Sequence, residues 1–283
     1  MMKMHSFFAE CTWMAQDKDK MKQMNVYHLL YFLFAPTLVF RLSYPRLERR
    51  SWSRVAAYGV QFLLVIVVSF MTIPNYLQKN FKDYGADNAI DRKRIIHLVL
   101  VTSVLGAVSV FSVFYGILHC WLNIWAELLR FADRGFYDKW WQLDSYSRYY
   151  RQWNLVVHDW LHNYCYREAI IRTNGNRQSA AILTFLISAV FHEYIITLAL
   201  GFYYPVLFIS FAGFGMFFFF VSLYFRRGAE IYGNIFLFFS IILGWSVQIV
   251  LYAVEHYSRN NCPQSKVSVD SRWYEQKLII IYC

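Results

Sequence analysis

The sequence predicts an all-α fold, a bundle of helices that crosses a membrane several times. The first observation is composition: of the 283 residues, 58% are hydrophobic and only 16% are charged. Soluble domains carry about a quarter charged residues, so this balance indicates a protein that has lipid as part of its solvent. The second is an aromatic content of 20%, rich in the Tyr and Trp that are typical of water–lipid interfaces. The third is a set of long stretches without acidic or basic residues.

These uncharged stretches are long enough to be membrane spans, because about 20 apolar residues cross the hydrocarbon layer as a helix. Gly201 and Pro205 divide one long apolar region into two spans. The run Tyr27–Phe40 is too short to cross and contains Pro36, so we expect a re-entrant or interfacial piece there. The predicted spans are 55–76, 95–118, 180–201, 203–225 and 232–254.

Basic residues lie in short blocks between the apolar runs and produce a net charge of +10. In a soluble protein this charge would suggest nucleic-acid binding, but such blocks orient membrane segments, so no nucleic-acid partner is predicted. The segments 41–54, 127–178 and 226–227 share one side, which is richer in Lys and Arg and is therefore predicted to be cytosolic. The tail 255–283 is then lumenal.

The five cysteines have no spacing typical of a metal site, so no metal is predicted. In a lumenal tail, Cys262 and Cys283 are able to form a disulfide, and two unpaired thiols are the equal alternative. The first residues of the chain have neither an apolar core nor a small-residue cleavage site, so no signal peptide is predicted.

The segment 119–178 mixes polar and aromatic residues, is too polar to cross lipid, and predicts two amphipathic helices on the cytosolic side. The apolar face of the first consists of Trp121, Ile124, Trp125, Leu128 and Leu129. Its polar residues Asn123, Glu127 and Arg130 point away from that face.

The second amphipathic helix runs from about Ser145 to Arg167. One of its faces carries a cation, an amide and two imidazoles: Arg151, Asn154, His158 and His162. An amide N–H suits the oxyanion that forms on a thioester carbonyl, and a guanidinium suits a phosphate. The alternative is the solvated polar face of an interfacial helix.

His192 is the most informative residue, about 12 positions into a predicted span and so near the middle of the membrane. An ionisable group at that depth is costly unless it faces protein or a water-filled cavity, which makes it a functional candidate. We expect a neutral imidazole that is able to accept a proton. A structural histidine bonded to a neighbouring helix is the alternative. Thr184 and Ser188 share its helix face, and Glu193 is predicted to have a structural role.

The chain resembles the membrane-bound O-acyltransferase superfamily and, within it, the sterol O-acyltransferase branch. The resemblance covers residues 3 to about 263 and is carried by three segments: Phe136–Gln142, Tyr149–Trp160 and Ser188–Tyr194. Shorter supporting segments are Lys3–Phe7, Tyr31–Thr37, Ser43–Arg46 and Leu118–Asn123. It implies that 1–283 form a single polytopic domain of this family, one that lacks the family's N-terminal helices.

The resemblance implies acyl transfer from acyl-CoA to a sterol hydroxyl inside a membrane chamber, with His192 as the catalytic base and Asn154 as its partner. It implies no cofactor, because acyl-CoA is a co-substrate, and it implies a homo-oligomer in the endoplasmic reticulum membrane. His119 matches a further family histidine. The residues implied to bind substrate are Phe136, Tyr137, Asp138, Trp140, Trp141, Gln142, Tyr150, Arg151, Trp153, His158 and Ser188.

Two departures from the family pattern keep other functions open. The family motif FYxDWWN reads FYDKWWQ here, so that the acid stands at Asp138 instead of the position of Lys139, and Gln142 replaces the last Asn. The chain is also shorter than the family, which suggests a fragment, a truncated gene model or a shortened protein. The alternatives are therefore a diacylglycerol O-acyltransferase, a catalytically inactive membrane protein and, in another class, a small-molecule transporter.

Overall fold

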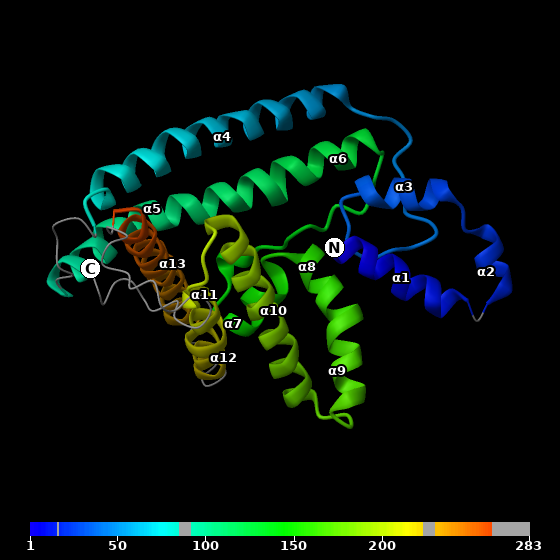
Figure 1. Cartoon of the computed structure of the whole chain (residues 1–283). Coiled ribbons are helices and arrows are strands. Elements are labelled where there is room, and N and C mark those ends of the chain that lie inside the picture. Colours follow the sequence, from blue (N-terminus) through cyan, green and yellow to red (C-terminus); the bar gives the residue numbers. More distant parts are fainter. Residues whose placement is uncertain (16, 85–91, 223–229, 262–283) are drawn as a thin grey trace, which may run out of the picture. The chain divides into compact units, whose positions relative to one another are not determined.

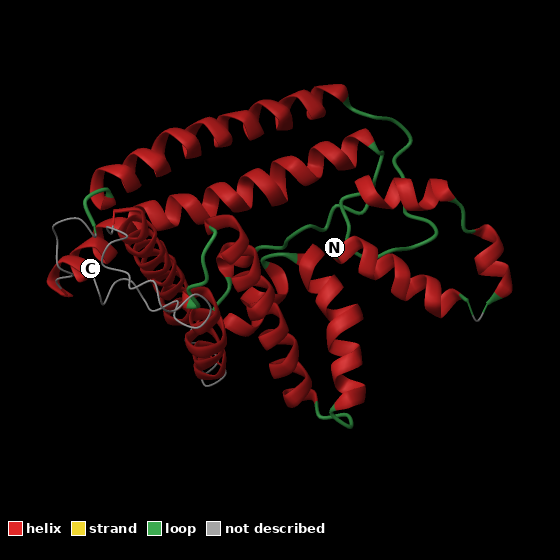
Figure 2. Cartoon of the chain, viewed as in Figure 1, coloured by secondary structure: helices red, strands yellow, loops and turns green. Residues whose placement is uncertain are grey.

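All regular elements that the structure describes are helices (Figures 1 and 2). This computed structural model describes residues 1–15, 17–84, 92–222 and 230–261. Within these ranges, strand-like pairing is an isolated bridge between Arg46 and Phe131. The chain divides into two compact units, the first made of Met1–Ile66 and Val113–Phe185, the second of Val67–Ser112 and Leu186–Cys283.

Among the described residues, four helices are long and apolar enough to cross a membrane. They contain or closely match four of the predicted spans, which confirms an all-α, multi-pass membrane protein. None of the side chains in the apolar window of the first is buried, as expected where lipid replaces water as the solvent. The four are α4 (Trp52–Phe81), the continuous helix Lys93–Leu128, α10 (Arg177–Leu200) and α13 (Glu230–Asn261).

The predicted boundary between the third and fourth spans is confirmed at Gly201 and Pro205. Helix α10 ends just before Gly201, whose φ of +76° lies in the left-handed region that glycine adopts without strain. The apolar helix 206–222 that follows is shorter than the usual 20 or so residues of a span. The predicted span 203–225 therefore stays a prediction, and residues 223–225 lie outside the described ones. The helix consists of α11 (Val206–Ile209), the π-helical η4 (Ser210–Gly215) and α12 (Met216–Ser222).

The N-terminal part of the first unit contains three short helices: α1 (Met2–Met14), α2 (Lys18–Gln23) and α3 (Val26–Phe34). The last of these ends at Phe34, and its C-cap Ala35 directly precedes Pro36. With 9 residues it is too short to cross a bilayer, as the sequence predicted. The Lys3 ammonium donates hydrogen bonds to the carbonyls of Phe32, Leu33 and Ala35 at distances of 2.6–2.8 Å. Burial lowers the pKa of Lys3 to about 8. Lys3 therefore caps the C-terminal end of α3.

The prediction of a separate interfacial helix near residues 119–130 is wrong in two respects. The second span continues without interruption to Leu128 through α5, η1 and α6, and Asn123 and Glu127 lie on its buried side while Trp121 is 42% exposed. The helical pattern had assigned those polar residues to solvent. The burial is reversed because Glu127 binds cations from other segments and Trp121 faces outward, where lipid tolerates it. The parts are α5 (Arg92–Val113), η1 (Phe114–Trp121, π-helical) and α6 (Leu122–Leu128).

The second predicted amphipathic helix, 145–167, is interrupted at Trp153 and Asn154. Asn154 has an extended backbone with φ −143° and ψ 88°, so the helix stops and restarts there. Arg151 therefore lies on a different helix from His158 and His162, and the predicted continuous polar face is wrong. The helices are α7 (Tyr146–Gln152), α8 (Leu155–Trp160), η3 (Leu161–Tyr166, π-helical) and α9 (Arg167–Arg172), preceded by the 3-10 turn η2 (Trp140–Gln142).

The second unit has a core in which α5 packs closely against α13. A side chain at Gly106 would lie 3.3 Å from the backbone nitrogen of Ser246, so the two helices touch through their main chains. The Ser246 hydroxyl donates to the carbonyl of Val99. Residues 255–261 of the predicted lumenal tail continue α13, and the remainder, with Cys262 and Cys283, lies outside the described residues. The core residues are Phe81, Tyr84, Leu98, Val250, Ala253 and Val254.

Candidate active site

The segment Phe136–Gln142 is held against the break between α7 and α8. The Leu155 amide donates to the Phe136 carbonyl, and the Asp138 amide donates to the Gln152 carbonyl, both at 2.9 Å. Main-chain hydrogen bonds therefore connect two of the segments that carry the family resemblance, Phe136–Gln142 and Tyr149–Trp160. This arrangement places Asn154 directly beside the segment to which the family resemblance assigns substrate binding.

An aromatic cluster surrounds Phe114 of η1. The ring centroid of Phe114 lies 4.7 Å from that of Tyr137, 5.0 Å from that of Trp140 and 5.3 Å from that of Trp153. Edge-to-face and tilted pairs of this kind add about 0.5–1.5 kcal/mol each beyond the area that they bury. Phe114 could not be identified from the sequence, because a phenylalanine within a membrane span carries no local signal of a role at a site.

His119 is part of the same cluster. Its Nδ1 lies 2.7 Å from the Tyr137 hydroxyl, and its ring stacks on Tyr115 at 4.8 Å and meets the Tyr58 ring edge-on at 5.4 Å. His119 lies in η1, and π-helical insertions are often found at functional sites. The structure thus gives this histidine a concrete task, which is to hold the second residue of the Phe136–Gln142 segment.

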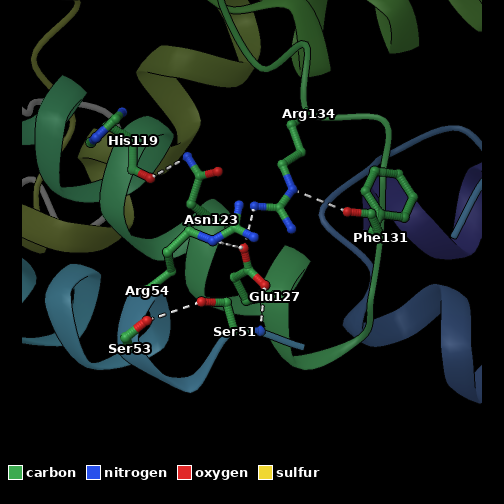
Figure 3. Close-up of polar contacts among 8 residues, drawn as sticks. All are labelled: Ser51, Ser53, Arg54, His119, Asn123, Glu127, Phe131 and Arg134. Carbon is green, nitrogen blue, oxygen red and sulfur yellow. Dashed lines mark hydrogen bonds and ion pairs between the residues drawn. The ribbon is translucent and has the colours of Figure 1, made fainter. Parts of the chain in front are cut away.

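About two turns further along the helix, Glu127 organises a buried polar network (Figure 3). Its carboxylate is 0% exposed and lies 2.7 Å from Arg134 Nη1 and 3.1 Å from Arg54 Nε, and it also accepts from the Ser51 amide at 3.2 Å. Separately, the Asn123 amide group donates to the His119 carbonyl of the π-helical segment at 2.7 Å (Figure 3). A buried carboxylate with two cations and an amide partner is well compensated. The network joins the start of α4 to the loop before Phe136.

Asn154 is the N-cap of α8. Its side-chain oxygen accepts a hydrogen bond from the Val157 amide at 3.1 Å. Because the cap uses the oxygen, the amide NH₂ is left as a donor, and no acceptor for it is found among the residues described. The side chain is half-buried. The NH₂ is therefore free to serve as the donor that the sequence analysis assigned to it; the capping role was not recognised from the sequence.

The other predicted substrate-binding residues of this unit differ in exposure. Arg151 is exposed and its guanidinium turns back to its own helix, with Nε 3.0 Å from the Ser147 carbonyl. Tyr150 is half-buried between Tyr146 and Phe185, with ring centroids 5.7 Å and 5.1 Å away, and burial raises its pKa, so it stays protonated.

His158 is half-buried and stacks on the exposed His162 with centroids 6.2 Å apart. The two histidines, four residues apart, therefore lie on one side of the helix, as the sequence predicted. Arg151, which was predicted to share that side, does not belong to it.

The altered positions of the FYDKWWQ motif all lie at the surface. Asp138 and Lys139 are exposed, and the Asp138 carboxylate accepts from the Lys139 amide at 2.8 Å. Trp141 and Gln142 are exposed as well, whereas Trp140 is 3% exposed. The departures from the family pattern therefore leave the packed part of the segment unchanged.

His192 lies on α10 in the second unit. Its Nδ1 is 2.7 Å from the Ser188 carbonyl and 3.5 Å from the Ser188 hydroxyl, and its ring stacks on Phe211 of η4 at 4.8 Å. A hydrogen bond from Nδ1–H to that carbonyl leaves the lone pair on Nε2, the nitrogen that would accept a proton. The ring is exposed within the described residues, and the chamber that would enclose it stays a prediction.

Glu193 has the structural role that the sequence analysis preferred. It is 4% exposed, accepts from the Phe208 amide at 2.9 Å, and lies 3.2 Å and 3.3 Å from the Tyr252 hydroxyl through its two oxygens. That hydroxyl also accepts from the Leu207 amide at 3.0 Å. Glu193 and Tyr252 together cap the first amide groups of α11 and join three helices, α10, α11 and α13.

The structure thus assembles two groups of predicted residues, one in each unit. The first contains the Phe136–Gln142 segment with Trp153 and Asn154, and the second contains Ser188 and His192. The pairing of Asn154 with His192 stays a prediction, and so does the chamber that would contain both.

A family comparison agrees with these features. The family model described as "MBOAT, membrane-bound O-acyltransferase family" matches residues 16–254, most of the chain. The chain therefore belongs to the membrane-bound O-acyltransferase family, as its motifs suggested.

Particular relatives define the branch. The chain is 38% identical over 276 residues to Sterol O-acyltransferase 1 of Mus musculus, covering 93% of this chain and 49% of the relative. It is 36% identical over 267 residues to Sterol O-acyltransferase 2 of Homo sapiens, covering 93% of this chain and 51% of the relative. The chain thus spans about half the length of the curated relatives it matches.

Proposed function

We propose that this protein transfers a fatty acyl group from acyl-CoA to the hydroxyl of a sterol and so forms a steryl ester in the membrane. The observation that carries the proposal is the similarity of 36–39% to sterol O-acyltransferases across 93% of the chain. The local contacts are compatible with it, because one hydrogen bond at Nδ1 of His192 leaves Nε2 for a proton and the cap made by Asn154 leaves its NH₂ as a donor. The proposed location is the endoplasmic reticulum membrane, and the proposed assembly is a homo-oligomer.

In the proposed reaction, the sterol oxygen attacks the thioester carbonyl carbon while Nε2 of His192 takes the hydroxyl proton. The carbon–sulfur bond then breaks, and the proton passes from the imidazolium to the departing thiolate of CoA. The Asn154 NH₂ would donate to the oxygen of the tetrahedral intermediate. The aromatic cluster around Phe114 would give the acyl-CoA region a rigid apolar wall. No covalent acyl-enzyme and no metal is needed for this sequence of steps.

Acyl transfer by the purified chain tests the proposal. Labelled oleoyl-CoA is offered with cholesterol and with diacylglycerol side by side, and we expect labelled cholesteryl ester to form. General base catalysis contributes about 10²–10⁴-fold, so His192→Ala should lower the turnover by at least about 100-fold. His97→Ala is the matched control, since His97 is an exposed histidine on another span of the same unit. Ester formation that survives His192→Ala would remove the histidine from the mechanism.

The same assay separates the alternatives. A product from diacylglycerol alone would favour a diacylglycerol O-acyltransferase, and no product from either alcohol with a folded wild-type chain would favour an inactive membrane protein. We consider an inactive membrane protein because the acid of the motif stands at Asp138 in this sequence.

A further inference from the structure

A cavity of about 140 Å³ lies in the first unit, apart from the residues that the sequence analysis assigned to substrate. Its lining includes two arginines, Arg41 and Arg46, and the aromatic rings of Tyr27, Tyr31 and Tyr44. No acidic residue contributes to this lining. A cationic cavity with aromatic walls is suited to an anionic group of small size.

Arg46 is fixed at both of its ends. Its backbone forms the bridge to Phe131, and the flanking Leu47 amide donates to the Arg130 carbonyl at 2.7 Å. Its guanidinium lies over the Tyr31 ring at 4.4 Å, and Nη2 donates to the Tyr27 hydroxyl at 3.2 Å. The guanidinium is exposed but held by these two contacts, so less entropy is lost when it binds an anion than for a side chain without contacts.

The hydroxyls of Tyr31 and Tyr44, two of the residues that line the cavity, make hydrogen bonds to main-chain groups. The Tyr31 hydroxyl donates to the Leu129 carbonyl at 3.3 Å, and the Tyr44 hydroxyl donates to the Val39 carbonyl at 2.9 Å. The Tyr44 hydroxyl also accepts from the Arg41 amide at 2.8 Å. The rings therefore stay in place without a ligand.

The positive charge of the cavity is left uncompensated by protein. A guanidinium has five N–H donors, and within the described part of the chain the partners of the Arg46 guanidinium are the neutral hydroxyls of Tyr27 and Tyr31. No acidic residue lines the cavity beside Arg41 or Arg46. Glu10, whose charge reaches Tyr44, is occupied by the Tyr164 hydroxyl at 2.9 Å. Two exposed guanidinium groups at one cavity, without a carboxylate in its lining, are suited to bind an anion.

The helix that supplies Tyr27 and Tyr31 also presents an apolar surface to its surroundings. Val26, Leu30 and Phe34 follow one another at steps of four along α3 and are 71%, 50% and 53% exposed. In a multi-pass membrane protein, such a face lies at the boundary between headgroups and acyl chains. A ligand of this cavity would therefore have its anionic group beside Arg46 and an apolar body beside α3.

We propose that this cavity binds the phosphate group of a membrane amphiphile, held in bidentate fashion by Arg46 and neutralised by Arg41. The phosphate has two possible sources, the headgroup of an anionic phospholipid and the nucleotide part of CoA. The exposed apolar face of α3 favours the phospholipid. A phospholipid site here does not depend on the proposed transfer chemistry, whereas a site for CoA rests on the proposed function.

Ligand binding to the full chain in detergent tests this assignment, with native mass spectrometry as the readout. The probes are dioleoyl phosphatidic acid, dioleoyl phosphatidylcholine, CoA and inorganic phosphate. We expect phosphatidic acid to bind more tightly than phosphatidylcholine, and Arg41→Gln/Arg46→Gln to weaken it at least about tenfold. The matched control is Arg49→Gln/Arg50→Gln, which removes the same charge from the same basic segment but outside this cavity.

Each result has a defined meaning. Loss of phosphatidic acid alone in the cavity variant identifies a lipid site, and loss of CoA alone identifies a nucleotide site. Equal losses in the cavity and control variants would show only a general attraction to positive charge and would overturn the proposal, as would no binding by the wild type. If Arg46→Gln unfolds the chain, the single variant Arg41→Gln replaces it, because the Arg41 side chain is exposed.

Discussion

Removal of the Glu193 carboxylate should loosen three helices at once. In Glu193→Ala, the buried Phe208 amide loses its acceptor at 2.9 Å and the Tyr252 hydroxyl loses its acceptors at 3.2 Å and 3.3 Å. Hydrogen bonds to a charged group contribute about 1.5–3 kcal/mol each in soluble proteins, but measured values between membrane helices average about 0.6 kcal/mol. Because Glu193 is 4% exposed and serves two donors, we expect a loss of about 2–4 kcal/mol in the free energy of unfolding.

The assay is reversible unfolding by sodium dodecyl sulfate in mixed micelles, followed by circular dichroism. Glu193→Gln keeps one acceptor oxygen and should lose about 1 kcal/mol. Tyr252→Phe removes one partner of the same group, so the double variant should lose less than the sum of the two single losses. Glu168→Ala is the control, because Glu168 pairs with Arg172 at the surface and contributes at most about 0.5 kcal/mol.

The reasoning would be refuted by Glu193→Ala unfolding at the same detergent fraction as the wild type. It would also be refuted by strictly additive losses in the double variant, since the hydrogen bonds at 3.2 Å and 3.3 Å require coupling between the two residues. An effect on acyl transfer without an effect on stability would point to direct contact with substrate instead of a structural role.

Three further predictions concern other parts of the chain. Burial lowers the pKa of Lys3 from 10.5 to about 8, so the unfolded chain binds more protons between these values; stability should therefore rise from pH 8 to 10.5, and Lys3→Met should abolish that part of the rise in melting temperature. Gly106→Val should cost about 1–3 kcal/mol, because its Cβ would lie 3.3 Å from the backbone of α13, whereas Gly244→Ala, with open space around it, should be neutral or slightly stabilising; equal effects would contradict the close crossing. Tyr137→Phe leaves a nitrogen of His119 without its partner at 2.7 Å and should cost about 1 kcal/mol in thermal unfolding, and an unchanged melting temperature would remove the proposed link.

Much of the candidate site could be predicted from the sequence, but mainly as a set of residues. The motifs identify the Phe136–Gln142 segment, Asn154 and His192 without reference to any contact. What they could not predict is how these residues are held. The cap made by Asn154 depends on a break in the helix, and that break is stabilised by main-chain bonds to Phe136 and Asp138, which lie outside the helix.

Glu127 shows a second feature that the sequence could not predict, namely which face of a membrane helix is buried. Helical periodicity groups Glu127 with the polar residues and predicts that they face water. In a helix surrounded by lipid, the apolar side faces outward and polar residues are buried with partners, here Arg54, Arg134 and the Ser51 amide. The pattern correctly separates two faces, but it does not indicate which of them is turned inward.

By itself, the sequence determined the helical class, four of the membrane spans, the break at Gly201 and Pro205, and the family. These follow from local chemistry: runs of apolar residues need helical hydrogen bonding in lipid, and glycine and proline interrupt it. Only the tertiary structure decided that Glu193 joins α10, α11 and α13, that His119 holds Tyr137, and that Arg46 stands over Tyr31. Those contacts connect residues far apart in the chain, and local propensity carries no information about which distant partner completes a buried polar group.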